Sequence, residues 1–358
     1  MKVLIISRST LYSSPGGDSV QIIETAKAVR ELGVEVDIKL TNETINYDKY
    51  DLIHFFNIIR PNDIIYHVNK SNKKFVVSTI FVDYSEYEKL NRTGILGTLF
   101  KILSPDQLEF VKSIARYIVN GEKINGYSYY FKGHKGTIEH LLNKASLLLP
   151  NSDSEYNRLK KRYSFDKDYI KVPNAVSTDF IDKSSENKRE GVICVGRIEG
   201  RKNQLNLIRA LKGTNIPLTI IGNYSPNHKS YYDLCVAEAG ENVTILGHLG
   251  KDEIIVQYKK HKAHILPSWF ETTGLSSLES ATMGCNVIVT AKGDTQEYFG
   301  EDAFYCEPDD LNSIRTAVEE AIKADFNTKL KEKIVAEYSW GKAAEKTVEA
   351  YKKTIQSN

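Results

Sequence analysis

The sequence has little of what marks several large classes of protein. It contains four cysteines in 358 residues, and none forms a Cys-x-x-Cys pair, so neither a disulfide framework nor a structural metal site is expected. No run of about eighteen apolar residues occurs, so a membrane-spanning helix is not predicted. The formal net charge is only +2, which argues against a general nucleic-acid surface. We therefore expect a soluble, cytoplasmic protein in which any anion site is local.

Nucleotide-binding motifs of fixed spacing are also missing. The sequence has neither the Gly-x-Gly-x-x-Gly fingerprint of dinucleotide-binding proteins nor the Gly-rich loop ending in Gly-Lys-Ser/Thr that cradles phosphates. The one Asp-x-Asp string, Asp166 and Asp168, lies in a loop before a predicted interdomain turn. We therefore expect no metal requirement and no bound cofactor.

Short apolar runs alternate with helical patterns along the first half of the chain. Strands are expected at Lys2–Ser7 and in the runs VEVDIKL, DLIHFF, KFVVSTIF and ASLLLP, which have the continuous apolar character of a buried parallel sheet. The first strand should lead into a helix from about Ser19 to Leu32, capped by Asp18 and closed by Gly33. Residues 84–144 break this rhythm with a lysine-rich and tyrosine-rich helical insertion.

The same alternation restarts in the second half. The runs VICVG, LTIIG, VTILG, AHILP and NVIVT predict five more strands with helices between them. The chain is therefore predicted to be α/β, with two doubly wound, Rossmann-like domains and a cleft between them. The expected divisions are an N-terminal domain at 1–174, a C-terminal domain at 175–340, and a helix at 341–358 that either covers the second domain or crosses back to the first.

A basic loop follows the first strand of the second domain. In VGRIEGRKN, at Val195–Asn203, Arg197, Arg201 and Lys202 surround Gly200 just before a helical pattern. Cations beside the free N–H groups of a helix N-terminus suit a phosphate or a diphosphate. A solvated basic turn explains the same residues about equally well.

Two acids flank a glycine in SWFETTGLSSLESATMG. Glu271 should lie in the loop after the strand AHILP, and a helix should start near Gly274 or Leu275 and end before the next glycine. The N–H groups of Leu275 and Ser276 would then be available to an anion, and Glu279, within the first two turns, could accept two ribose hydroxyls. The alternative is an exposed loop acid and an acid favoured by the helix dipole.

A third segment, SSPGGDSV, follows the first strand of the chain. Gly16 and Gly17 would let the backbone approach a ligand closely, although an ordinary loop explains the pair as well.

Together these segments resemble the retaining nucleotide-sugar glycosyltransferases of family 4, which belong to the group 1 glycosyltransferases and have the GT-B fold of two facing Rossmann-like domains. PSWFETTGLSSLES matches the family's two glutamates separated by seven residues, and GRIEGRK matches its phosphate-binding Arg and Lys. VPNAV matches its interdomain turn, and PGGDSVQ matches its N-terminal glycine loop. The resemblance covers essentially the whole chain and is strongest from Val172 to Trp340.

This resemblance implies transfer of a hexose, with retention, from a UDP- or GDP-linked donor to a hydroxyl of a glycan or lipid-linked glycan acceptor in bacterial surface polysaccharide assembly. Arg197 and Lys202 would hold the donor diphosphate, and Glu271 would hold the sugar; these three form the expected catalytic set. Glu279 would bind the ribose. The full expected donor-binding set is Gly16, Gly17, Arg197, Lys202, His248, Glu271, Gly274, Leu275, Ser276 and Glu279.

The sequence departs from the family at the sugar site. VVSTIFVDYSEYE lacks the histidine that many relatives carry there, and His54, one strand earlier, is expected to be a core or rim residue. Thr273 replaces the usual aromatic residue after Glu271. A sugar-nucleotide epimerase of the same fold and a catalytically degenerate sugar-nucleotide-binding subunit therefore remain alternatives.

The acceptor would lie on the N-terminal domain. Residues 99–145 interleave apolar residues with lysine and arginine, a pattern that suits either peripheral contact with an anionic membrane or a solvated basic surface.

Overall fold

The computed structural model describes residues 1–91, 103–120, 127–181 and 189–357. The chain forms two compact units: unit 1 comprises Met1–Asn174 and Trp340–Asn358, and unit 2 comprises Ala175–Ser339. Among the described residues, no helix is both long and apolar enough to cross a bilayer.

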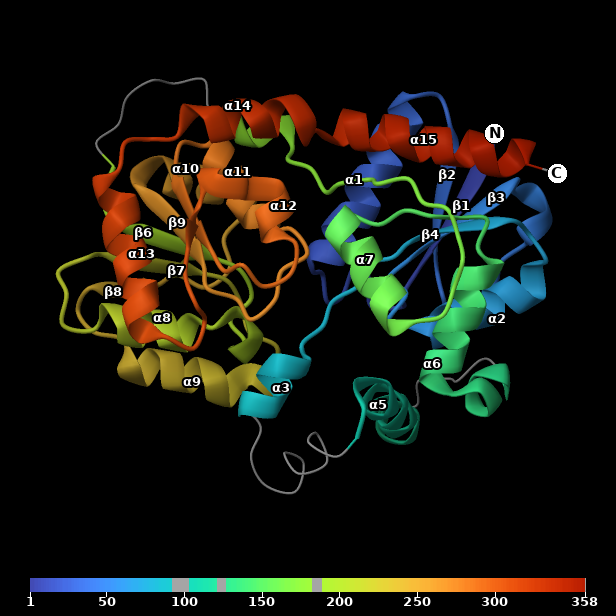
Figure 1. Cartoon of the computed structure of the whole chain (residues 1–358), viewed down its shortest axis with the longest axis horizontal. Helices are drawn as coiled ribbons and strands as arrows, with labels where there is room; N and C mark the ends of the chain where they lie inside the picture. The colour runs from blue at the N-terminus through green and yellow to red at the C-terminus, as the bar shows by residue number, and fades with distance from the viewer. Residues whose placement is uncertain (92–102, 121–126, 182–188, 358) are drawn as a thin grey trace. The chain divides into compact units, whose positions relative to one another are not determined.

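Unit 1 is built on a parallel sheet with the strand order β2-β1-β3-β4-β5 (Figure 1). Its strands are β1 (Lys2–Ser7), β2 (Glu35–Leu40), β3 (Leu52–Phe56), β4 (Phe75–Ser78) and β5 (Leu147–Leu148). Its helices are α1 (Gly17–Glu31), α2 (Pro61–Ser71), α3 (Ser85–Asn91), α5 (Pro105–Asn120), α6 (Tyr127–Lys144), α7 (Asp153–Arg162) and α15 (Trp340–Gln356), with a 3-10 turn at Tyr47–Lys49. The apolar runs of the first half are therefore parallel strands, as predicted.

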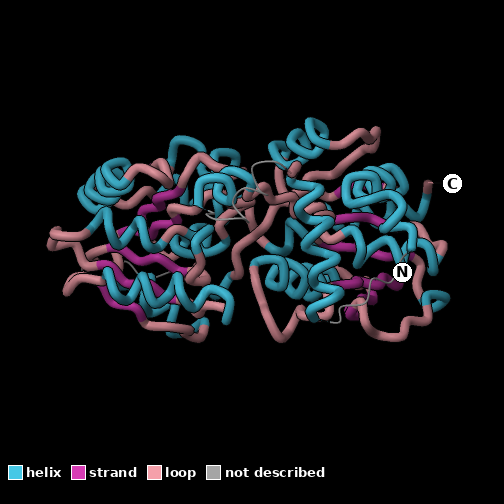
Figure 2. The backbone as a smooth tube through the Cα atoms, turned by 90° about the horizontal axis from the view of Figure 1, so that it is seen from below, coloured by secondary structure: helices cyan, strands magenta, loops and turns pink. Residues whose placement is uncertain are grey.

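Helices cover both faces of this sheet, which explains why its strands are apolar at successive positions (Figure 2). Ile53 and Phe55 of β3 join the core formed with α2 and α6. His54, between them, faces the opposite way and pairs through Nδ1 with the Tyr351 hydroxyl of α15 at 2.7 Å. Burial lowers the pKa of His54 to about 3. His54 is thus a neutral core residue, one of the two interpretations that the sequence left open.

Two details of unit 1 differ from expectation or extend it. The N-cap of α1 is Gly16 rather than Asp18, which lies inside the first turn and pairs with Arg8 (Nε to Oδ2, 2.8 Å).

The helical insertion contains α3, α5 and α6, although residues 92–102 and 121–126 of the segment lie outside the described residues. On α6 the side chain of Phe131 is 91% exposed. Membrane contact by this segment stays a prediction.

Unit 2 is built on a second parallel sheet, with the order β11-β10-β9-β6-β7-β8. Its strands are β6 (Val192–Val195), β7 (Leu218–Ile221), β8 (Val243–Ile245), β9 (Ala263–Leu266), β10 (Asn286–Val289) and β11 (Phe304–Tyr305). Its helices are α8 (Gln204–Leu211), α9 (Lys229–Glu238), α10 (Lys251–Lys260), α11 (Leu275–Thr282), α12 (Thr295–Phe299), α13 (Leu311–Lys323) and α14 (Thr328–Glu337), with 3-10 turns at Thr178–Phe180, Gly200–Lys202, Pro226–His228 and Gly300–Asp302. All five predicted strands are present, and the short edge strand β11 is additional.

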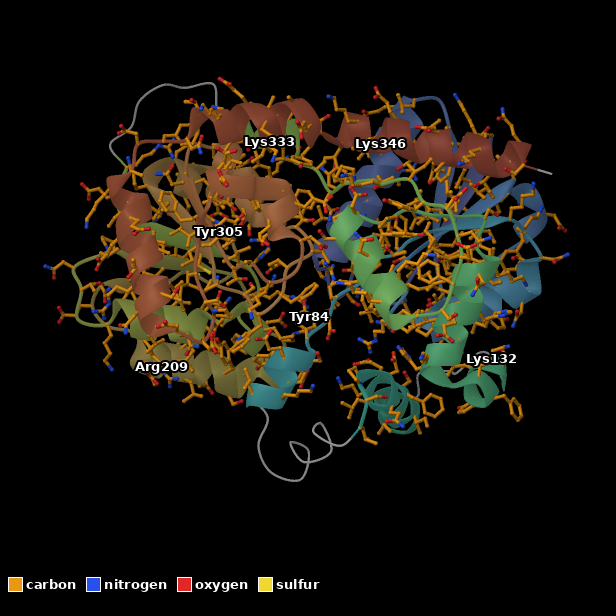
Figure 3. All side chains as sticks on the ribbon, viewed as in Figure 1. Tyr84, Lys132, Arg209, Tyr305, Lys333 and Lys346 are labelled. Atoms are coloured by element: carbon orange, nitrogen blue, oxygen red, sulfur yellow. The ribbon has the colours of Figure 1, made fainter. Side chains whose placement is uncertain are left out.

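Successive residues of β6 belong to two different cores. Val192 and Cys194 pack with α8, α9 and α13, whereas Ile193 and Val195 pack with α10, α11 and α14. Side chains fill the space between the sheet and its helices (Figure 3). Since apolar side chains cover both faces of the sheet, polar groups of this unit are expected to meet a ligand beyond the carboxyl ends of its strands.

Gly222 allows two of the loops at the carboxyl edge to meet. It follows β7 with a φ of +154°, and a Cβ built there would overlap the carbonyl oxygen of Gly196, which follows β6. Gly196 directly precedes Arg197, so this close approach also fixes the start of the basic loop.

We expect Gly222→Ala to destabilise the protein by about 1–3 kcal/mol more than Gly213→Ala, because it adds backbone overlap to the strain of a positive φ. Gly213 is the matched control: it has a φ of +76° in the same unit, and beyond its two chain neighbours no heavy atom lies within 4 Å of the position that an alanine Cβ would take. Denaturant unfolding of both variants measures the difference. Equal unfolding midpoints would show that the two loops do not need this contact.

Candidate active site

The two segments singled out in the second half of the sequence meet at one sheet edge. Strands β6 and β9 are hydrogen-bonded neighbours in parallel register, so their carboxyl ends open on the same side. The basic loop leaves β6 after Val195, and the acidic loop leaves β9 after Leu266. The edge of unit 2 is thus lined by cations from one strand and carboxylates from the next.

Lys202 and Glu271 form the closest contact between these loops. The Lys202 Nζ lies 2.5 Å from the Glu271 Oε1, and the two side chains are only 20% and 10% exposed. The backbone of Glu271 is held on both sides, because its N–H donates to the Lys292 carbonyl and its own carbonyl accepts from the Asp294 N–H. Gly293 permits this pairing, since a Cβ there would overlap the Glu271 carbonyl. The carboxylate therefore has a defined position beside the lysine.

Asn203 fixes the end of the basic loop and was not among the residues expected to matter. It has a φ of +65°, and its side-chain amide donates to the carbonyl oxygens of Pro267 at 3.0 Å and Pro308 at 2.6 Å. Helix α8 begins at the next residue, Gln204, whose amide donates to the Arg197 carbonyl at 2.8 Å. An asparagine directly before a helical pattern was the available signal, since this residue tolerates the left-handed conformation.

Glu199 is the second residue that the sequence did not single out. Its side chain is 3% exposed and lies 3.1 Å from Arg201, 3.7 Å from Arg197 and 3.6 Å from the His228 ring. Burial raises the pKa of Glu199. The positive charges of Arg201, Arg197 and Lys202 together outweigh this effect, so the pKa of Glu199 is below its usual value. A buried, ionised carboxylate therefore holds the guanidinium groups of the basic loop.

The N-terminus of α11 faces this edge. Gly274 caps the helix with a φ of +78°, and its carbonyl accepts from the N–H groups of Ser277 and Leu278. The Ser276 hydroxyl donates to the Val195 carbonyl at 2.9 Å, which ties the helix to the end of β6. Among the described residues, the N–H groups of Leu275 and Ser276 have no protein acceptor. They supply the partial positive charge of a helix start.

Glu279 lies one turn further along α11, as predicted from the sequence. Its Oε2 accepts a hydrogen bond from the Tyr258 hydroxyl at 3.2 Å. Burial raises the pKa of Glu279 to about 7, against the opposing effect of the Tyr258 hydrogen bond. This carboxyl group therefore changes its protonation state near neutral pH.

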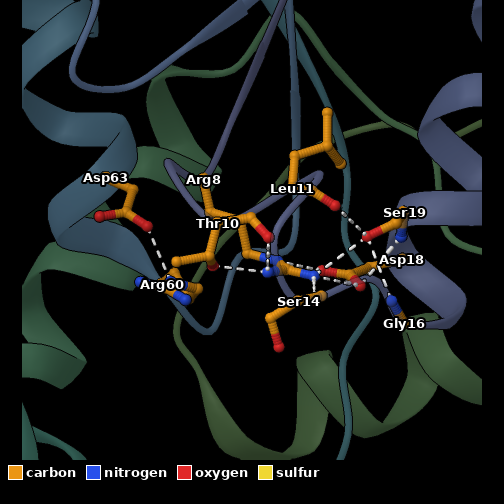
Figure 4. A network of polar contacts seen from close by, with 9 residues as sticks. All are labelled: Arg8, Thr10, Leu11, Ser14, Gly16, Asp18, Ser19, Arg60 and Asp63. Atoms are coloured by element: carbon orange, nitrogen blue, oxygen red, sulfur yellow. Dashed lines mark hydrogen bonds and ion pairs between the residues drawn. The ribbon is translucent and has the colours of Figure 1, made fainter.

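Three residues of the expected set belong to other segments of the chain. His248 is exposed on the loop after β8, and β8 is separated from β6 by β7. Gly16 and Gly17 belong to unit 1, where they begin α1, and Figure 4 shows the polar network around Gly16. Their roles in donor binding stay predictions. Among the described side chains, no group of three or more potential ligands is arranged to hold a metal ion.

Solved structures define the class of fold. Sucrose-phosphate synthase from Thermosynechococcus elongatus matches with a TM-score of 0.75 at 15% identity, over 100% of both chains. The Anabaena protein Alr3699/HepE, solved in complex with UDP, matches with a TM-score of 0.72 at 14% identity, over 98% of this chain and 100% of that one. The chain has the GT-B fold of these glycosyltransferases.

Sequence comparison relates the second unit to a particular family of glycosyltransferases. Residues 176–338 match the family model described as "Glycosyl transferases group 1". An uncharacterized glycosyltransferase of Methanocaldococcus jannaschii is 28% identical over 45% of this chain and 44% of its own length. O-antigen chain mannosyltransferase B of Escherichia coli is 22% identical over 59% of this chain and 61% of its own length. The chain thus spans about half the length of these relatives, and its residues 176–338 form a domain of the group 1 glycosyltransferases.

The raised pKa of Glu279 predicts a pH-dependent stability. Below a pH of about 4.5 the carboxyl group carries its proton in both the folded and the unfolded chain. Between about 4.5 and 7 the unfolded chain ionises while the folded chain keeps the proton, so the folded state loses stability as the pH rises through this range. The wild type should therefore lose stability relative to Glu279→Gln across this window, by on the order of 1–3 kcal/mol. Thermal unfolding from pH 4.5 to 8 measures it, with Glu241→Gln, an exposed acid of the same unit, as the control. Parallel curves for wild type and Glu279→Gln would contradict the assignment.

Proposed function

We propose that the chain transfers a hexose, with retention, from a nucleoside diphosphate sugar to a hydroxyl of a glycan or lipid-linked glycan acceptor. The observation that carries this proposal is the Lys202–Glu271 pair beside the start of α11. A carboxylate, an ammonium group and two helix N–H groups then lie around one sheet edge, where a sugar and its diphosphate each have a partner.

Charge on the leaving group dominates the proposed chemistry. Breaking the bond between the anomeric carbon and oxygen places negative charge on the diphosphate and positive character on the sugar. Arg197, which is 46% exposed, and Lys202 would stabilise that diphosphate, together with the N–H groups of Leu275 and Ser276. Glu271 would hold sugar hydroxyls, and the departing phosphate oxygen would accept the acceptor's proton.

The nucleoside would lie toward Glu279. A carboxylate can accept hydrogen bonds from both ribose hydroxyls, and such bonds would favour the ionised form of a group whose pKa is about 7. The complex of Alr3699/HepE with UDP supports UDP as the nucleotide, with GDP as the alternative. The O-antigen and serotype-specific mannosyltransferases of Escherichia coli support the proposed surface polysaccharide pathway.

We expect Lys202→Ala to lower turnover by roughly 10²-fold, the usual effect of removing one group that stabilises transition-state charge. Release of nucleoside diphosphate from a panel of UDP-glucose, UDP-N-acetylglucosamine and GDP-mannose provides the assay. Lys229→Ala is the matched control, because Lys229 forms an ion pair with Asp233 on the surface of the same unit. Wild-type turnover in Lys202→Ala, with both variants folded, would defeat the proposal.

A further inference from the structure

The hydroxyl group of Tyr258 contacts the helix that carries Glu279. Tyr258 belongs to α10, which packs with α11 on the same face of the unit 2 sheet (Figure 1), and its side chain is fully buried. Its hydroxyl oxygen lies 3.2 Å from the Glu279 Oε2 and 3.2 Å from the Ser276 carbonyl oxygen, both on α11. A tyrosine hydroxyl has a single hydrogen, so it donates fully to only one of these two acceptors at a time.

The protonation state of Glu279 decides which acceptor receives this hydrogen. An ionised carboxylate can only accept, so the Tyr258 hydroxyl then donates to Glu279. A protonated carboxyl group has an O–H of its own, which can donate to the Tyr258 oxygen, and the tyrosine then donates to the Ser276 carbonyl. The 3.2 Å contact between Tyr258 and Glu279 therefore persists in both states, but the direction of its hydrogen bond reverses.

The second carboxyl oxygen of Glu279 is left for a ligand. Among the described residues, Tyr258 is the only group that hydrogen-bonds to this carboxyl group, and Glu279 is half-buried. The Tyr258 ring is held in place by edge contacts with Phe180 and His264, at centroid distances of 6.2 and 5.9 Å. A fixed hydroxyl thus holds Oε2, and Oε1 is available to the hydroxyl groups of a ribose.

The other titratable side chains of the neighbouring strands are uncharged near pH 7. They are His264 on β9, Cys194 on β6 and Cys285 directly before β10. Burial lowers the pKa of His264 to about 3 and raises the pKa of each thiol to about 12. Burial and the Tyr258 hydrogen bond are therefore the two opposing effects on the pKa of Glu279.

The charged side chains of the elements packed against α11 are paired or lie away from its core face. Asp179, in the turn beside α11, pairs with Lys251, and the cations of the basic loop lie against their own carboxylate partners. Helix α14 contributes the apolar Leu330 and Ile334 to this core. The charged residues of α10 and α14 are half-buried or exposed: Lys251, Asp252, Glu253, Lys259, Lys260, Lys329, Lys331, Glu332, Lys333 and Glu337.

We propose that Tyr258 is a positioning residue of the nucleoside site, which holds one oxygen of Glu279, directs the other toward the ribose, and shifts its hydrogen bond from Ser276 to Glu279 when a nucleotide binds. The proposal rests on the proposed binding of ribose by Glu279. In the binding step the O–H bond of the Glu279 carboxyl group breaks, and its proton passes to the solvent. The carboxylate then accepts hydrogen bonds from Tyr258 and from the ribose, which favour the ionised form.

Tyr258→Phe tests the proposal, because it removes the hydroxyl and keeps the ring that packs against Phe180 and His264. Tyr305→Phe is the matched control: the Tyr305 hydroxyl also donates to a carbonyl, that of Gly300 at 2.6 Å, but it lies on the edge strand β11. Calorimetric titration of UDP and GDP, each with its 2′-deoxy form, into the full chain at pH 7 measures binding.

We expect the wild type and Tyr305→Phe to prefer the ribonucleotide over its 2′-deoxy form by about 10-fold or more, the effect of losing one hydrogen bond to a charged group. Tyr258→Phe should lose most of this preference, because its Glu279 is neither held nor ionised at pH 7. Glu279→Gln should lose most of it as well, because the charge is absent.

The pH profile distinguishes positioning from a loss of packing. Ionisation of Glu279 must accompany its bonds to the ribose, so wild-type affinity should fall by up to about 10-fold for each pH unit below about 7. The Tyr258 hydrogen bond lowers the pKa of Glu279, so in Tyr258→Phe that pKa is higher and the fall should begin at a higher pH. Titrations in two buffers of different ionisation enthalpy count the protons. Relative to Glu279→Gln, the wild type should release most of one proton at pH 6 and almost none at pH 9, and a proton lost by the nucleotide itself cancels in this comparison.

Three results would overturn the positioning role: Tyr258→Phe keeps the wild-type preference for ribose, its affinity follows the wild-type pH profile, or the wild type releases no more protons at pH 6 than Glu279→Gln. The proposed function fails by a different result. If the wild type binds neither UDP nor GDP, or binds them no better than their 2′-deoxy forms, Glu279 does not hold the ribose, and both proposals fall.

Discussion

The ion pair between Lys202 and Glu271 joins two loops that are 69 residues apart in the sequence, and the rest of the site is arranged around it. Breaking a buried pair by removing one partner costs about 3–5 kcal/mol, because the remaining charge is poorly solvated. The pair can form here because β6 and β9 are direct neighbours and Gly293 lets the loop after β10 fix the Glu271 backbone. The positions of the Lys202 and Glu271 side chains, and their ion pair, are thus established before any ligand binds.

The other cations of the basic loop are likewise paired with a carboxylate of the protein. Arg201 and Arg197 lie against Glu199, and Lys202 lies against Glu271, so each cation has a carboxylate partner within the protein. Without those acids, three cations on one short loop would repel one another. A diphosphate that enters this edge would share or replace a carboxylate partner, which makes binding an exchange of anions rather than the filling of a bare positive site.

The sequence predicted the framework well because both sheets are covered on both faces. Apolar runs such as VICVG and AHILP therefore stand out from the polar loops, and the carboxyl ends of neighbouring parallel strands must meet at one edge. The start of α11 and the places of Glu271 and Glu279 followed from that rule, and the structure confirms them.

Other features depend on contacts between distant segments and could not be read locally. Glu199 looks like a solvated acid among basic neighbours, and only the packing of its loop and of the turn that carries His228 buries it. Asn203 holds Pro267 and Pro308, which are 64 and 105 residues away.

The central claim is that the edge shared by β6 and β9 binds a nucleoside diphosphate, and a crystal structure of the chain with UDP tests it most directly. We predict that the diphosphate oxygens lie within about 3 Å of Lys202 Nζ, of the Arg197 guanidinium or of the N–H groups of Leu275 and Ser276, with the ribose hydroxyls on Glu279. A nucleotide bound elsewhere on unit 2, with Lys202 and Glu279 touching no atom of it, would contradict the claim.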